Sequence, residues 1–116
     1  MPEIYFKTID LGTISAGSTV NNQVTSDDNY IIKRIYVVEY TSTAVGTRFL
    51  TGTFRVDGYV FTKDVVPLSL FDGYRNQVPE LNIDFSKGKT FYYSVKNNHP
   101  SDSIAAYLVL ELQKAS

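Results

Sequence analysis

The chain has no cysteine, no tryptophan and a single histidine, His99. Without cysteine it has no disulfides, no thiol nucleophile and no cysteine-ligated zinc site, although this does not fix its compartment. It also has no run of about 18 apolar residues, the length that a membrane-spanning helix needs. Its first ten residues, MPEIYFKTID, include acidic residues and no apolar core of a signal peptide. We therefore expect no membrane segment and no signal peptide.

An excess of charge of one sign is also missing. The 11 basic and 12 acidic residues are spread along the chain and give a net charge of −1. Because a nucleic-acid-binding surface needs clustered lysine and arginine, we expect no nucleic-acid partner. The run Asp27-Asp28-Asn29 offers three oxygen-bearing side chains. Adjacent residues converge poorly on one cation, so a plain turn is favoured and we expect no metal and no cofactor.

Catalytic motifs are sparse as well. His99 lies in a polar loop and is followed by Ser101, Asp102 and Ser103. These are the residue types of a serine triad, but they are also the ordinary composition of a loop. The chain has no phosphate-binding loop, no dinucleotide fingerprint and no zinc-binding helix motif. We therefore expect no catalytic residues and a protein that is not an enzyme.

The chain is rich in residue types that favour β-strands. Val, Ile, Thr, Tyr and Phe make up about two-fifths of its 116 residues and favour extended structure. Turn-forming clusters separate about eight such stretches, and no helical periodicity runs longer than about two turns. Without helices to connect parallel strands, the sheets must be mainly antiparallel. We predict one domain over residues 1–116, an all-β antiparallel β-sandwich, with an eight-stranded jelly roll favoured.

Residues 54–64, FRVDGYVFTKD, predict a tight hairpin around their Asp-Gly pair. In a two-residue loop Val56 faces Tyr59 and Phe54 faces Phe61, so these four side chains share one face of the hairpin. We assign that face to the core. Alternation along the other strands completes the predicted core: Ile31, Ile35, Val37, Phe54, Phe61, Leu81, Ile83, Phe85, Phe91, Leu108 and Leu110.

The stretch of residues 30–40, YIIKRIYVVEY, has more apolar surface than one buried face requires. Its even positions combine tyrosines with an arginine, the residue types enriched at protein interfaces. We favour the interpretation in which this second face packs against another copy or a partner. A β-bulge that changes the buried face halfway along the strand is the alternative. The predicted contact residues are Arg34, Tyr36, Val38 and Tyr40, with Tyr92 and Tyr107 pointing outward from other strands.

Five segments follow one another in an order that covers most of the chain: LGTISAGSTV, YIIKRIYVVEY, FRVDGYVFTKD, FSKGKTFYYSVKN and SIAAYLVLELQK. In this order of strands and turns the chain resembles small jelly-roll structural proteins of virus and phage particles, such as capsid decoration, minor capsid and fibre-head proteins. The resemblance implies a non-enzymatic virion protein that forms a homo-oligomer, with a trimer favoured, and docks on a major capsid protein. No family motif carries binding residues onto this chain.

A carbohydrate-binding β-sandwich module is the alternative function. Such modules use exposed aromatic side chains together with Asp and Asn on loops. The residues of that kind are Tyr59, Tyr74, Asn76, Asn97 and Asn98. The lack of tryptophan, the commonest stacking platform in such modules, weighs against this alternative, and a glycan remains a possible ligand.

Overall fold

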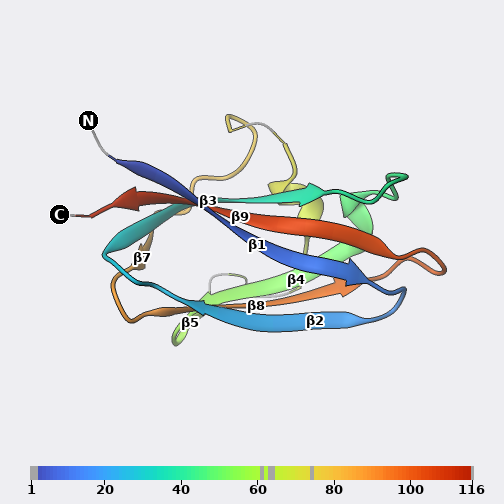
Figure 1. Ribbon diagram of the computed structural model, residues 1–116, viewed down its shortest axis with the longest axis horizontal. Coiled ribbons are helices and arrows are strands. Elements are labelled where there is room, and N and C mark those ends of the chain that lie inside the picture. Colours follow the sequence, from blue (N-terminus) through green and yellow to red (C-terminus); the bar gives the residue numbers. More distant parts are fainter. Residues whose placement is uncertain (1–2, 61, 63–64, 74, 116) are drawn as a thin grey trace.

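The described part of the chain forms two antiparallel sheets packed face to face and contains no α-helix (Figure 1). The computed structural model describes residues 3–60, 62, 65–73 and 75–115. Sheet A has the spatial order β1 (Ile4–Ile14), β9 (Ile104–Lys114), β3 (Tyr30–Glu39) and β7 (Ile83–Phe85). Sheet B has the order β2 (Thr19–Thr25), β8 (Thr90–Asn97), β4 (Leu50–Val56) and β5 (Tyr59–Val60), and β6 (Val66–Pro67) pairs with the start of β4. Two short 3-10 helices, η1 (Thr47–Phe49) and η2 (Leu68–Phe71), lie in the connections. The predicted all-β antiparallel sandwich is confirmed.

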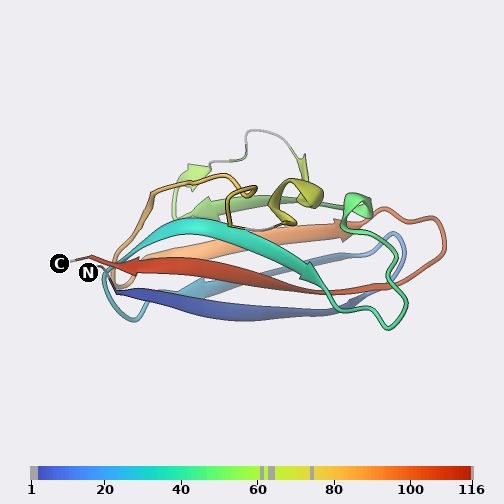
Figure 2. The same cartoon turned by 90° about the horizontal axis from the view of Figure 1, so that it is seen from above.

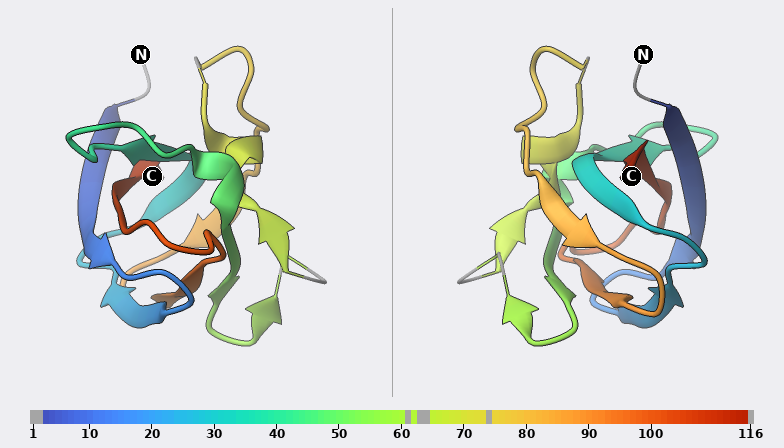
Figure 3. Two further views of the ribbon diagram at one scale, coloured as in Figure 1. Left: turned by 90° about the vertical axis from the view of Figure 1, so that its right-hand side faces the viewer. Right: turned by 90° about the vertical axis from the view of Figure 1, so that its left-hand side faces the viewer.

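The strand pairing is nested. β1 pairs with β9, β2 with β8, β3 with β7, and β4 with both β5 and β6. The chain therefore passes from one sheet to the other at each of the connections β1–β2, β2–β3 and β3–β4. The views from above and along the long axis show the two layers, with β5 and β6 at one edge (Figures 2 and 3). β1 begins and β9 ends at the same end of the sandwich (Figure 1).

The space between the sheets is filled by side chains from alternate positions of the strands. In sheet B, Phe54 stacks on Phe91 with ring centroids 5.6 Å apart, and Phe71 of η2 meets Phe54 edge-on at 5.5 Å. In sheet A, Leu108 and Leu110 of the central strand β9 are fully buried. Eight of the predicted core residues are confirmed: Ile35, Val37, Phe54, Ile83, Phe85, Phe91, Leu108 and Leu110.

β3 changes its buried face at Lys33. From Ile32 to Arg34 the strand advances by two residues while its partner β9 advances by one, so Lys33 is an extra residue and forms a β-bulge. Ile32 and Ile35 are both fully buried although they are three residues apart. The prediction that the even positions of this strand form one external face is therefore wrong for Ile32, because the bulge directs its side chain into the core.

The same bulge explains why one of the predicted core residues is not fully buried. Ile31 is only half-buried, because Ile32 takes the inward position beside it. Leu81 is half-buried as well, since it lies before the start of β7, where its N–H donates to the Lys33 carbonyl at 2.8 Å. Phe61 lies outside the described residues.

The hairpin at residues 54–64 has the predicted two-residue loop, because Val56 pairs with Tyr59 and Arg55 pairs with Val60. Phe54 and Val56 are buried as expected. Tyr59, however, is 62% exposed, so its assignment to the core is wrong. The reason is that β5 is only two residues long and lies at the edge of sheet B, where it pairs with β4.

Candidate interface and binding surfaces

The outer face of sheet A brings together five of the six predicted contact residues. Arg34, Tyr36 and Val38 follow one another along this face of β3, and Tyr107 of β9 is the pairing partner of Val38. Tyr40 comes directly after β3 and continues the pairing, since its N–H donates to the Ala105 carbonyl at 2.7 Å. We call this surface the sheet A face and include in it the outward residues of β1: Ile4, Phe6, Thr8 and Asp10.

A buried carboxylate lies on the sheet A face. Glu111 of β9 is 1% exposed. Its Oε2 is 3.0 Å from Nη1 of Arg34, its Oε1 accepts a hydrogen bond of 2.7 Å from the Tyr36 hydroxyl, and Nε of the exposed Arg75 lies 3.5 Å from Oε1. Burial, together with the hydrogen bond to Glu111, raises the pKa of Tyr36 to about 12. Arg34 therefore supplies the opposite charge and Tyr36 a hydrogen bond to a carboxylate that would otherwise be costly to bury.

Tyr40 and Tyr107 form the second cluster of the sheet A face. Their rings stack with centroids 4.2 Å apart, and the Tyr40 hydroxyl donates to Oδ1 of Asp10 at 2.7 Å. The hydrogen bond to Asp10 raises the pKa of Tyr40 to about 12. The same bond, followed by one from the Gly12 N–H, lowers the pKa of Asp10. Tyr40 thus links the segment after β3 to β9 and β1 while 38% of its surface stays exposed.

The apolar surface that no neighbour covers on this face belongs chiefly to Phe6 and Val38. Phe6 is 62% exposed and pairs with Glu111, whereas Val38 is 47% exposed and pairs with Tyr107. Ile4, next along the same face of β1, is also exposed. Neither β1 residue was predicted as a contact. Their only signal in the sequence is the apolar run Ile4-Tyr5-Phe6, which a buried strand explains equally well.

Tyr92, the sixth predicted contact residue, lies on the outer face of sheet B and shares no surface with the other five. It lines a groove of about 410 Å³, which we call the sheet B groove. The residues around this groove are Asn21, Asn22, Gln23, Thr53, Phe54, Arg55, Val60, Tyr92, Tyr93 and Ser94. A hollow of about 220 Å³ shares Thr53 and Ser94 with the groove and extends it to Lys96.

Pairing across four strands places the side chains of the sheet B groove. Gln23, Tyr92, Arg55 and Val60 form one row across β2, β8, β4 and β5, and Asn21, Ser94 and Thr53 form the next row. The guanidinium carbon of Arg55 lies 3.7 Å from the centroid of the Tyr92 ring, a cation–π contact. Sequence reasoning did not predict this groove, because its residues come from strands whose pairing the sequence does not specify.

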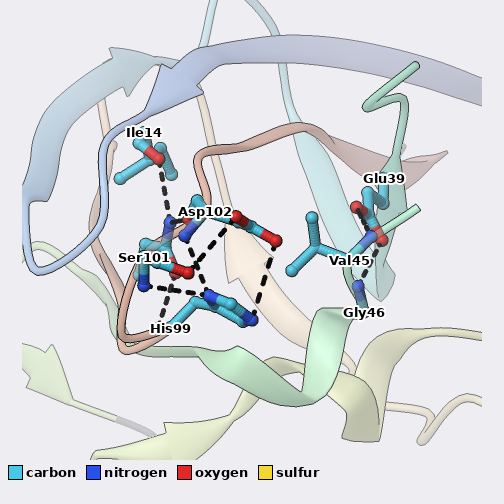
Figure 4. Close-up of polar contacts among 8 residues, drawn as sticks. Ile14, Glu39, Val45, Gly46, His99, Ser101 and Asp102 are labelled. Carbon is cyan, nitrogen blue, oxygen red and sulfur yellow. Dashed lines mark hydrogen bonds and ion pairs between the residues drawn. The ribbon is translucent and has the colours of Figure 1, made fainter. Parts of the chain in front are cut away.

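The loop around His99 is held by its own hydrogen bonds (Figure 4). Nδ1 of His99 accepts from the N–H groups of Ser101 and Asp102 at 3.1 and 2.9 Å, and Nε2 lies 3.9 Å from Oδ2 of Asp102. The buried Asn97 side chain donates to the Ile14 carbonyl at 2.9 Å and to the Asp102 carbonyl at 2.8 Å. The Nδ1 lone pair is therefore occupied, and the loop is fastened to the end of β1.

The residues considered for sugar binding lie in separate places. Tyr59 lies beside β4 at its C-terminal end, whereas Asn97 pairs with the first residue of β4. Asn98 uses its amide to donate to the Thr51 hydroxyl at 2.7 Å. Asn76 is exposed in the connection before β7, and Tyr74 lies outside the described residues.

Comparisons of the chain with protein-family models, with curated proteins and with solved structures find no match. Among the residues that the structure describes, no three acidic or histidine side chains are grouped so as to hold a metal ion. The described residues also include no helix with the length and apolar character needed to cross a membrane. A function is therefore best argued from the sheet A face and the sheet B groove.

Proposed function

We propose that the chain is a non-enzymatic structural subunit of a virus particle, which associates with copies of itself and docks on a larger lattice such as that of a major capsid protein. The observation that carries this proposal is the exposed apolar surface of the sheet A face, centred on Phe6 and Val38. Phe6 and Val38 lie two rows apart on this face, with Val109 and Tyr36 in the row between them. Extended apolar surface of this kind is typical of a face that a partner covers. A symmetric contact between copies would cover the same patch on each subunit.

The nested strand pairing supports the architecture in this proposal. If β5 and β6 are counted as two pieces of one interrupted strand, eight strands pair first with last, second with second-last, and so on inward. We infer that the sandwich is a jelly roll, an architecture that viral capsid proteins and lectins use.

Hydrophobic burial supplies the driving force of the proposed association. Covering about 400 Å² of apolar surface per subunit would contribute on the order of 10 kcal/mol before the costs of association. The buried Glu111 cluster contributes little to that term, because its charges are already paired within the subunit. We expect Phe6, Val38 and Tyr40 to dominate the contact, with a trimer as the favoured assembly.

Light scattering coupled to size-exclusion chromatography tests the proposal. The native chain should show a mass several times 13.1 kDa at high concentration, and Phe6→Ser combined with Val38→Ser should shift it to the monomer. Leu70→Ser is the matched control, because Leu70 is exposed to a similar degree but lies on η2. A native chain that stays monomeric at high concentration would overturn the assembly role.

The carbohydrate-binding alternative is favoured by a different observation, the sheet B groove, whose lining combines amide, hydroxyl and guanidinium groups with aromatic side chains. This groove lies on the opposite outer face from the proposed contact. The two roles are therefore compatible in one subunit, and each can be tested without disturbing the other.

A further inference from the structure

We propose that the sheet B groove binds an acidic saccharide, a hydroxyl-rich chain that carries carboxylate or sulfate groups, with Arg55 as its anion-binding residue. This inference gives a ligand class to the carbohydrate-binding alternative and rests on it, not on the assembly role. The size of the groove supports it, because about 410 Å³ lies within the usual range of small-molecule sites.

The charge of the groove selects an anion. Arg55 lines the groove and Lys96 lies at its extension, and no acidic side chain is among the described lining residues of either. Because Arg55 and Lys96 lie on the same face and are four residues apart in pairing register, the two cations are separated by roughly 13 Å along the strands. A chain with repeated anionic groups can contact both. The site is locally positive even though the whole chain carries a net charge of −1.

Arg55 is positioned to bind an anionic group through two of its oxygens. The guanidinium carbon lies 3.7 Å from the centroid of the Tyr92 ring, a contact that restrains the side chain, and Nη1 donates to the Asp57 carbonyl at 2.5 Å. A guanidinium has five N–H donors, and Arg55 makes no other hydrogen bond with the described residues. The remaining donors can grip a carboxylate or sulfate through two parallel hydrogen bonds.

The rest of the groove matches the hydroxyl groups of a sugar. Asn21 and Gln23 present side-chain amides, and Thr53 and Ser94 present hydroxyls. None of these four side chains forms a hydrogen bond within the described part of the chain, so their donors and acceptors are open to a ligand. Amides and hydroxyls both donate and accept, which suits hydroxyl groups that do the same.

Two features make a saccharide a better fit than a nucleic acid. Among the described lining residues, the groove and its extension offer two cations, too few for a phosphate backbone that is neutralised along its length. Arg55 covers a face of the Tyr92 ring, which is thereby lost as a stacking platform for a base.

Isothermal titration calorimetry of the full chain tests this inference. The probes are a sulfated heparin-derived oligosaccharide, a carboxylated polygalacturonate-derived oligosaccharide and a neutral maltooligosaccharide of the same length. At least one acidic probe should bind, and Arg55→Gln should weaken binding by about tenfold or more, since a hydrogen-bonded charge is lost. Gln23→Ala should weaken it by a smaller factor.

Arg48→Gln is the matched control. It also removes an exposed arginine that lies over an aromatic ring, that of Phe49 at 4.8 Å, but it lies outside the groove. Equal loss of binding in Arg48→Gln and Arg55→Gln would overturn the proposal, as would the absence of binding by both acidic probes. Binding of the neutral probe alone, weakened by Gln23→Ala, would overturn the acidic ligand class while keeping a carbohydrate-binding role. Phe6→Ser combined with Val38→Ser should leave binding unchanged, so that failure of the assembly role and failure of this inference are distinguishable.

Discussion

Glu111 is a buried carboxylate, so its partners should be costly to remove. Arg34→Met leaves a carboxylate that is 1% exposed without its closest cation. Breaking a buried ion pair in this way costs about 3–5 kcal/mol, because the remaining charge stays desolvated. Arg75 contacts the same carboxylate from an exposed position, so Arg75→Met should cost less than about 1 kcal/mol. Urea denaturation measures both free energies of unfolding, and equal values for the two variants would contradict this account of the cluster.

Tyr40 gives the sheet A face a measurable alkaline titration. Its pKa in the folded chain is raised from 10.0 to about 12 by the hydrogen bond to Asp10. A group whose pKa is raised on folding stabilises the fold fully below its unfolded pKa. The contribution of Tyr40 is therefore complete below pH 10 and is lost as the pH rises toward 12.

Absorbance at the tyrosinate band, followed against pH, checks this prediction. Tyr36 and Tyr40 should ionise about two pH units above ordinary tyrosines. Tyr40→Phe should remove one of these late transitions and raise the pKa of Asp10, which loses its strongest hydrogen bond. A late titration that is unchanged in Tyr40→Phe would show that the bond to Asp10 is not formed in solution.

At the scale of the element, the bulge in β3 makes two neighbouring isoleucines unequal. Ile32 is fully buried and Ile31 is half-buried. Ile32→Ala should therefore destabilise the fold by about 2–5 kcal/mol through lost contacts and a cavity. Ile31→Ala should cost about 1 kcal/mol or less, because part of its side chain already meets water. A strand without the bulge, with the odd positions inward, would give the opposite order in thermal or urea unfolding.

Where a strand alternates regularly between apolar and polar residues, the sequence predicts correctly which side chains point into the core. Leu108, Leu110 and Phe91 lie where alternation puts them, because the alternate positions of their strands include polar or amphipathic residues such as Tyr107, Glu111 and Tyr92. Ile31 and Ile32 are chemically identical, so no pattern tells which one points inward. The bulge at Lys33 is decided by packing against β9, and this is a contact between residues far apart in the chain.

The candidate surfaces were predicted less completely, because they too depend on contacts between strands that are far apart in the chain. The sheet A face needs β1 beside β9 to bring Phe6 next to the predicted contact residues. The sheet B groove needs β2, β8, β4 and β5 side by side. Its side chains, such as Asn21 and Gln23, are ordinary outward-facing polar residues until the strand order places Arg55 across from them.

At the scale of the whole molecule, the two outer faces carry different chemistry. The sheet A face has exposed apolar side chains around internally paired charges. In the sheet B groove, the side chains of Asn21, Gln23, Thr53 and Ser94 form no hydrogen bond within the described part of the chain, and Arg55 contacts an aromatic ring beside them. In the proposed assembly, one face joins the subunits while the other stays open to solvent and to a ligand.

Labelling of a cysteine introduced at position 38 by a thiol reagent tests that assignment most directly. The chain suits the method because it contains no cysteine of its own. In Val38→Cys the introduced thiol is the only one, and its rate of labelling reports whether the sheet A face is covered. The account predicts rapid labelling in dilute protein and slow labelling at high concentration, with Leu70→Cys labelled at one rate throughout. Equal labelling of Val38→Cys at both concentrations would contradict the claim that another copy of the chain covers this face.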